Sequence, residues 1–203
     1  MSDAGLERFW LALHEIWRKR RNVVCWQHMK RGIACLLLAC LLSASGPQSW
    51  GGPAPSIEIF FSLRGGCTEA VVNAINHATN NVLVQAYSFT SAPIADALVD
   101  AHKRGVEVQV ILDKSQRTVK YSSADFVAHA GIPTFVDAKH AIAHNKIMVI
   151  DGYEILTGSF NFTKAAEEKN AENLLVIQDA PLSAQYAANW QNHLQHSEPY
   201  KVR

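Results

Sequence analysis

The stretch that decides the fold of this chain is HNKIMVIDGYEILTGSFNFTKAAEEKNAEN, residues His144–Asn173. Its first part, His144–Ile150, is apolar and β-branched beyond Lys146, which predicts a strand, and Tyr153–Thr157 predicts a second strand. Asp151-Gly152 between them is a strong signal for a two-residue hairpin loop. The stretch therefore predicts an antiparallel hairpin.

The predicted hairpin gathers polar side chains on one face. With a two-residue loop, Lys146 lies opposite Thr157 and His144 opposite Ser159, with Cβ atoms roughly 5 Å apart in each pair. Because side chains alternate along a strand, Asn161 shares the face of Ser159. An imidazole, an ammonium, a hydroxyl and a carboxamide together suit a phosphate group, since they supply a nucleophile or acid, a positive charge and two neutral donors.

Outside this hairpin, predicted strands alternate with predicted helices. The strands are Ile57–Ser62, Val82–Phe89, Val106–Leu112, Ile132–Val136 and Asn173–Ile177. The helices are Cys67–Asn80, Pro93–Arg104, Ser122–Ala130, Thr163–Lys169 and Leu182–His196. This alternation favours a layered α/β fold, and the antiparallel hairpin makes its β-sheet mixed.

The spacing within the hairpin resembles the signature of the phospholipase D superfamily: His-x-Lys, four residues, Asp, six residues, Gly-Ser-x-Asn. Every position is filled, by His144, Lys146, Asp151, Gly158, Ser159 and Asn161. The segments Gly158–Ala166 (GSFNFTKAA), Glu172-Asn173 and Ala86–Thr90 (AYSFT) resemble the small bacterial endonucleases of that superfamily. The resemblance extends from about Ile57 to the C-terminus and implies a phospholipase D-like fold.

His144 is the candidate nucleophile, because an imidazole attacks phosphorus directly and gives a phosphohistidine. An ordinary pKa near ~6.5 keeps a neutral fraction of this ring available at neutral pH. Lys146, Ser159 and Asn161 are expected to bind the phosphate oxygens. By resemblance, Glu172 accepts a hydrogen bond from the other ring nitrogen of His144 and fixes its tautomer; the alternative is an exposed carboxylate at a strand start.

The resemblance also predicts a homodimer. In the family, a second copy of the same histidine protonates the leaving oxygen, and this chain carries one motif. The active site would then lie on a two-fold axis, and the two histidines would titrate as a coupled pair. Since the cationic groups come from the protein, no metal and no other cofactor is expected.

Three further residues have two interpretations each. Asp151 belongs to the signature, but an Asp-Gly turn explains it fully, so a structural role is favoured over a catalytic one. Ser88 and Thr90, which with Gly158 are candidates for substrate binding, match the family pattern after a buried strand. Their alternative role is a strand-end hydroxyl that caps the helix near Pro93.

The histidines outside the signature are not predicted to bind metal. His140 and His144 are four residues apart, which on a helix would form a metal pair. Here they lead into a strand, where four residues span roughly 13 Å, so zinc is rejected. Five others lie on predicted helices and are interpreted as surface residues without partners: His77, His102, His129, His193 and His196. Phe160 and Phe162 are expected to face the core.

The first 46 residues predict a segment for export. A basic stretch from Met29, the apolar run Ile33–Leu42 and the small residues Ser43–Gly46 form a secretory signal peptide. Residues 1–28 are interpreted as a translated upstream extension or a cytoplasmic tail, residues 47–56 as a linker and residues 57–203 as the phosphodiesterase domain. The alternative is an uncleaved membrane anchor, although ten apolar residues fall short of the ~20 that span a bilayer. We expect a periplasmic or secreted protein.

Charge after Gly46 is slightly negative. Of 19 basic residues 12 remain, and of 18 acidic residues 15 remain, which gives a net charge of −3. The basic footprint typical of a nucleic-acid binder is missing. Attraction to a nucleic acid would then come from local patches, which are otherwise solvated surface: Lys103-Arg104, Lys114 with Arg117 and Lys120, and Lys164 with Lys169. Cys67 is the one cysteine after Gly46, so that part forms no intrachain disulfide.

The sequence therefore predicts a metal-independent phosphodiesterase that cleaves DNA or RNA with little sequence preference. A phospholipase D that hydrolyses phospholipid head groups is the alternative, since motif and fold are common to both. A non-catalytic phosphate-binding module is the third hypothesis, and the complete signature counts against it.

Overall fold

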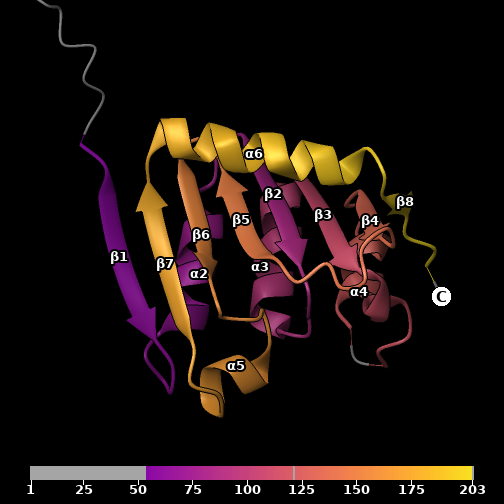
Figure 1. The fold of residues 1–203 in the computed structure, drawn as a ribbon, viewed down its shortest axis with the longest axis horizontal. Helices are drawn as coiled ribbons and strands as arrows, with labels where there is room; N and C mark the ends of the chain where they lie inside the picture. The colour runs from indigo at the N-terminus through magenta and orange to yellow at the C-terminus, as the bar shows by residue number, and fades with distance from the viewer. Residues whose placement is uncertain (1–53, 121, 203) are drawn as a thin grey trace, which may run out of the picture. The chain divides into compact units, whose positions relative to one another are not determined.

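The computed structural model describes residues 54–120 and 122–202 (Figure 1). Within them, eight strands form one mixed sheet in the order β1-β7-β6-β5-β2-β3-β4-β8. The strands are β1 (Ser56–Phe61), β2 (Asn81–Ala86), β3 (Glu107–Asp113), β4 (Thr134–Asp137), β5 (Lys146–Ile150), β6 (Glu154–Gly158), β7 (Asn173–Gln178) and β8 (Glu198–Pro199). Strands β2, β3 and β4 pair in parallel, and the other pairs are antiparallel. The predicted mixed α/β sheet is confirmed.

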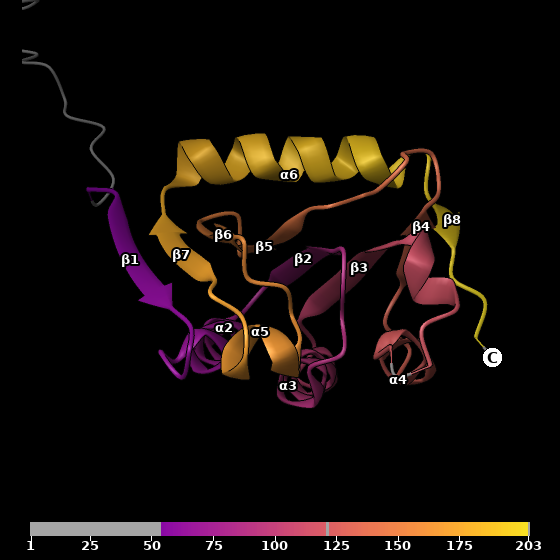
Figure 2. The ribbon, with the colours of Figure 1, turned by 60° about the horizontal axis from the view of Figure 1, so that its bottom comes forward.

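Helices cover both faces of this sheet. They are α2 (Cys67–His77), α3 (Ala92–Lys103), α4 (Ala124–His129), α5 (Lys164–Glu168) and α6 (Ala180–Leu194), with a 3₁₀ helix η1 (Lys114–Arg117). Figure 2 shows α6 on one side of the sheet and α2, α3 and α4 on the other. The arrangement follows from the chain order, because the crossovers of the parallel strands place α3 and α4 on one face.

The core lies between the sheet and these helices. Strand β2 is buried at Val82, Val84 and Ala86, and α3 contributes buried Ile94 and Leu98. On the other face, the fully buried Trp190 of α6 donates from Nε1 to the carbonyl oxygen of Val84, at 2.8 Å. Phe160 and Phe162 are 1% and 0% exposed, so the prediction that they face the core is confirmed.

The predicted export segment lies outside the described residues. Among the helices that the structure describes, none has the length and apolar character of a membrane span.

The hairpin register differs from the prediction by one residue. Strands β5 and β6 pair Ile150 with Glu154 and Ile147 with Thr157, so the loop contains three residues and Lys146 is not opposite Thr157. The reason is Tyr153, whose carbonyl oxygen accepts the backbone N–H of Asp179 at 3.0 Å. Asp179 is the N-cap of α6, and the N–H of Tyr153 donates within the turn to the carbonyl oxygen of Ile150, so Tyr153 stays outside the ladder of β5 and β6. The predicted opposition of His144 and Ser159 is wrong for the same reason.

Two of the five histidines predicted to be unpartnered surface residues have a common partner. His77 and His129 are exposed, but the side chains of His193 and His196 are only 14% and 22% exposed. Both contact the buried carboxylate of Asp137 at the end of β4. The prediction was wrong because the partner comes from a strand far away in the sequence.

Asp151 holds the turn before β2. Its Oδ2 accepts from the backbone N–H and the hydroxyl of Thr79, and its Oδ1 accepts from the N–H groups of Asn80 and Asn81, all at 2.8 or 2.9 Å. These amides are thereby unavailable for helical bonds, which explains why α2 ends at His77 and not at the predicted Asn80. The contacts agree with a structural role for this carboxylate.

The pKa of Asp151 is lowered by these contacts. Burial alone raises it, but the hydrogen bonds from the amides of Asn81, Thr79 and Asn80 outweigh burial. A carboxyl group with a lowered folded pKa stabilises the native state above its ordinary pKa of about 3.9, and this contribution is lost as pH falls through the folded value.

We therefore expect Asp151→Asn to lower the free energy of unfolding by about 1–3 kcal/mol at pH 7, because one amide oxygen replaces two charged acceptors. Asparagine tolerates the left-handed backbone of residue 151, where φ is 52°. The difference from wild type should shrink as pH falls below about 4, measured by urea unfolding. Asp100→Asn, which removes an exposed ion pair with Lys103, is the control. Equal stability of Asp151→Asn and wild type at pH 7 would contradict the assignment.

Candidate active site

His144 and Lys146 lie at the entrance to β5. Strand β5 begins at Lys146, so His144 precedes it and its side chain is exposed. Lys146 is only 6% exposed, and its Nζ donates to the carbonyl oxygen of His144 at 2.7 Å. The buried ammonium group of Lys146 therefore contacts the backbone of His144, the residue whose imidazole is exposed.

Tyr87 contacts both groups and was not identified from the sequence. Its ring centroid lies 4.5 Å from that of His144, and Lys146 Nζ lies 5.0 Å from the same ring. The second contact has the geometry of a cation–π interaction. The position of Tyr87 directly after the buried strand β2, within the stretch AYSFT, was the available signal.

Lys146 is an under-coordinated buried cation. Burial lowers its pKa, and the carboxylate of Glu172 partly opposes this effect. An ammonium group has three donors, of which the His144 carbonyl takes one. Within the described part of the chain, no other hydrogen bond to Nζ is present. The remaining donors are available to an anionic ligand.

The Gly-Ser-x-Asn segment turns sharply after β6. The N–H groups of Ser159 and Phe160 both donate to the carbonyl oxygen of Asn173 at 3.1 Å, and Ser159 Oγ accepts from the N–H of Asn173. Phe162 then pairs with Phe89 in an isolated parallel bridge. The two buried phenylalanines fix the segment beside the residues that follow β2.

Asn161, which lies between Phe160 and Phe162 in the sequence, has an unsatisfied side-chain amide. Its Oδ1 atom is buried and has no hydrogen-bond partner among residues 54–120 and 122–202. Whether the amide presents its oxygen or its NH₂ group at this position, the group has bonding capacity unused. An unsatisfied buried polar atom costs about 1–3 kcal/mol, which a ligand could recover.

Glu172 does not bond the His144 ring in this conformation. Its Oε1 accepts from Asn170 Nδ2 at 3.0 Å, and its N–H donates to Ser62 Oγ at 2.8 Å. Burial lowers the pKa of Lys146, and the carboxylate of Glu172 opposes this effect.

The residues after β2 approach the signature through their backbone. The N–H groups of Thr90 and Ser91 both donate to the carbonyl oxygen of Phe162 at 3.0 Å. The cap of α3 is Ser91, without a side-chain bond, so neither Ser88 nor Thr90 fills the capping role considered from the sequence. Thr90 also lines a cleft of about 460 Å³ together with Lys164 of α5.

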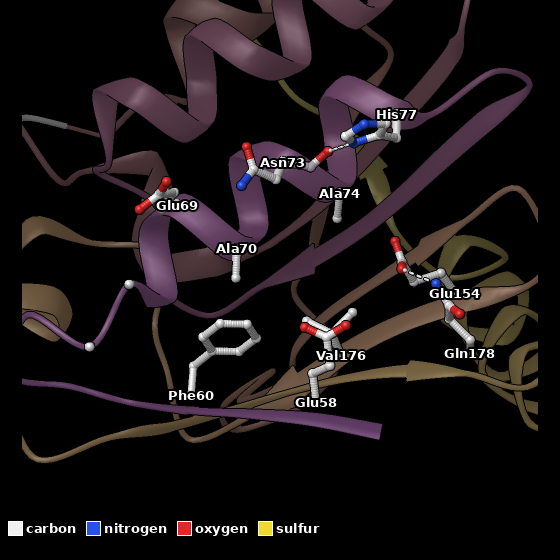
Figure 3. Close-up of a pocket in the computed structure, with 12 residues that line it drawn as sticks. Glu58, Phe60, Glu69, Ala70, Asn73, Ala74, His77, Glu154, Val176 and Gln178 are labelled. Carbon is white, nitrogen blue, oxygen red and sulfur yellow. Dashed lines mark hydrogen bonds between the residues drawn. The ribbon is translucent and has the colours of Figure 1, made fainter. Parts of the chain in front are cut away.

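A larger cleft of about 690 Å³ lies away from this site, between β1 and α2 (Figure 3). Its lining includes the carboxylates of Glu58, Glu69 and Glu154, and Lys146 and His144 are not part of it. Three carboxylates repel an anionic phosphodiester, so cleft size does not locate the substrate here.

Comparison with known proteins agrees with the signature. A family model described as "Cardiolipin synthase, PLD-like domain" matches residues 71–194. The chain belongs to the phospholipase D superfamily.

Relatives in this superfamily include two of similar extent. Phospholipase D of Rickettsia felis is 41% identical over 136 residues, which are 67% of this chain and 68% of that protein. The crystal structure of Nuc from Salmonella typhimurium, a phospholipase D family member, is 37% identical with a TM-score of 0.70, and the match covers 72% of this chain and 99% of Nuc. NucT from Helicobacter pylori, 23% identical with a TM-score of 0.66, shares the fold. Like other members of the superfamily, the protein is a hydrolase of phosphodiester bonds.

Gly158, a candidate for substrate binding, also has a steric requirement. A Cβ atom built there would lie 2.3 Å from the carbonyl oxygen of Asn173. This is the carbonyl that binds the N–H groups of Ser159 and Phe160. A side chain at residue 158 would therefore displace both β7 and the segment that leads to Asn161.

We expect Gly158→Ala to lower the free energy of unfolding by about 2–4 kcal/mol, since overpacking adds to an unfavourable φ of 154°. Thermal unfolding followed by circular dichroism measures this loss. Gly105→Ala is the matched control, because φ there is also positive but the space is open, so only about 1–2 kcal/mol is expected. Equal losses in the two variants would show that the contact with Asn173 is unimportant.

Proposed function

We propose that this protein hydrolyses nucleic acid without a catalytic metal, through a covalent phosphohistidine at His144. The supporting observation is the exposed imidazole of His144 beside the buried, under-coordinated ammonium of Lys146. A phosphate held by the free donors of Lys146 and by Asn161 would lie within reach of the imidazole.

The reaction has two displacements. A ring nitrogen of His144 attacks phosphorus, a P–N bond forms, and the P–O bond to the leaving group breaks as that oxygen takes a proton from a second imidazole. Water then attacks phosphorus, gives its proton to the second imidazole, and the P–N bond breaks. Lys146 stabilises the charge on the non-bridging oxygens in both steps.

The second imidazole is proposed to be His144 of another copy of the chain. One chain supplies one signature, and a two-fold axis would bring two copies of His144 to one phosphate. Glu172 would bias the charge of the pair through Lys146.

Nucleic acid is the proposed substrate because the GSFNFT stretch and the single signature resemble the small endonucleases of the superfamily. A phospholipid head group is the second candidate. It is favoured by Ile142, a 57% exposed apolar side chain two residues before His144, and by the Rickettsia relatives named phospholipase D.

In excess EDTA, the purified protein should nick supercoiled plasmid, and His144→Ala should lower the rate at least ~10³-fold, as loss of a nucleophile does. His129→Ala, an exposed histidine on α4, is the matched control and should keep wild-type activity. Residual activity of His144→Ala within a few-fold of wild type would refute the phosphohistidine. If the folded wild type does not nick plasmid but releases choline from phosphatidylcholine vesicles, the substrate is a phospholipid head group.

The shared site predicts a quadratic dose response. When wild type and His144→Ala are mixed and exchanged between dimers, a wild-type fraction of one half should give about one quarter of the activity, because both histidines are required. Activity of about one half, or an active monomer by light scattering, would contradict the shared site.

A further inference from the structure

A second cluster of chemically active side chains lies at the far end of the sheet, at β4 and α6. The carboxylate of Asp137 is 0% exposed and ends β4. Its Oδ2 lies 2.7 Å from His193 Nδ1, 3.2 Å from His140 Nδ1 and 3.3 Å from His196 Nε2. Three imidazole nitrogens thus converge on one buried carboxylate oxygen.

The four groups have the spacing of ligands around one metal ion. Their candidate ligand atoms all lie within 4.8 Å of one another. A tetrahedral Zn²⁺ with bonds of about 2.0–2.1 Å separates its ligand atoms by about 3.3 Å. The nitrogens of His140 and His196 already lie about this far from Asp137 Oδ2, at 3.2 and 3.3 Å, whereas the 2.7 Å contact of His193 would open and ligand atoms as far apart as 4.8 Å would close. The centroids of the three imidazole rings lie 5.0, 5.2 and 5.4 Å apart, so each ring is a neighbour of the other two.

The carboxylate is oriented from behind. Asp137 Oδ1 accepts the backbone N–H of Lys139 at 3.1 Å and lies 3.3 Å from His140 Nδ1, whereas Oδ2 faces all three imidazoles. Such a hydrogen bond to the second oxygen is typical of carboxylates that ligate metal.

We propose that Asp137, His140, His193 and His196 bind one zinc ion. Three neutral imidazoles and one carboxylate are ligands that zinc prefers, and four protein ligands leave no open position, which makes the site structural. The side chain of His140 is 44% exposed, so the ion can enter from solvent. His144 is not a member of this cluster, so metal-free catalysis at His144 and zinc at this site are compatible.

The zinc ion would fasten the segment that leads to His144. His140 lies in the connection between β4 and β5, while His193 lies in the last turn of α6 and His196 directly after the C-cap of that helix. Further along the connection, the N–H of Ala143 donates to Asp113 Oδ2 at 2.7 Å. Zinc would hold the start of this connection to α6, as Asp113 holds its end to β3.

Zinc content of the full-length chain tests the site directly. Because Cys25, Cys35 and Cys40 can also bind zinc, the readout is the difference between variants after gel filtration in zinc-free buffer. Wild type should carry one zinc ion per chain more than His193→Asn. His129→Asn, an exposed histidine outside the cluster, is the matched control and should equal wild type. Equal zinc content in wild type and His193→Asn would overturn the proposal.

A second variant is needed because a misfolded His193→Asn would also lose zinc. His140→Asn changes the most exposed of the three ligands, and circular dichroism verifies that it folds. Zinc at about one hundred times the Kd should raise the Tm of wild type by about 5 °C or more, and EDTA should reverse this. In His140→Asn the rise in Tm should be lost, or should require a zinc concentration at least 10-fold higher. A wild-type Tm that neither zinc nor EDTA changes would refute the zinc site. The cluster would then be held by the contacts of Asp137 with the histidines alone.

The geometry is tested with cobalt. Co²⁺ in a four-coordinate site absorbs visible light strongly, and six-coordinate Co²⁺ absorbs weakly. A strong visible band on wild type that is absent from His140→Asn supports the closed shell of four protein ligands. A weak, six-coordinate spectrum on wild type would contradict it.

Discussion

The burial of the Lys146 ammonium group is the constraint on which the site depends. Removing a cation from water costs several kcal/mol unless partners compensate. Here the compensation is incomplete, since Nζ has the His144 carbonyl, the ring of Tyr87 and the more distant charge of Glu172. A fixed positive charge with free donors stabilises a phosphoryl transition state without further reorganisation. The same incomplete compensation leaves donors of Lys146 available to an anionic ligand.

The signature combines chemistry and architecture. His144 and Lys146 stand at one end of β5, whereas Asp151 stands at the other end and bonds the turn before β2. Gly158 allows β7 to pack closely, because only a residue without a Cβ atom leaves room for the carbonyl oxygen of Asn173. The role of each residue in the signature therefore follows from the contacts that it makes in the fold, and not from the fact that it belongs to the signature.

Much of the fold was predictable from the sequence because its signals are local. The apolar strand β5, the glycine after α3 and the buried Phe160 and Phe162 follow from pattern alone. The hairpin register was not predictable, since Tyr153 gives its carbonyl to the start of α6. Contacts between distant elements leave no local signal.

The same limit applies to the two sites. The contact of Tyr87 with His144 depends on the pairing of β2 with β5, which no local pattern specifies. His193 and His196 are 56 and 59 residues from Asp137 in the sequence, so no local pattern indicated their common partner. The informative spacing was Asp-x-x-His at the end of β4 and His-x-x-His at the end of α6, two half-sites that only the fold unites.

The position of His144 depends on both ends of its segment. A nucleophile displaced by about 1 Å can lose about 10²-fold in rate, and His144 lies in a connection without regular structure. On its C-terminal side, the ladder of β5 and the Lys146 bond fix the backbone. On its N-terminal side, Asp113 binds the N–H of Ala143, and Lys114 Nζ binds the carbonyl of His140. The cluster at Asp137 completes this second anchor, so a metal ion there would act on catalysis only through the stability of the connection that presents the imidazole.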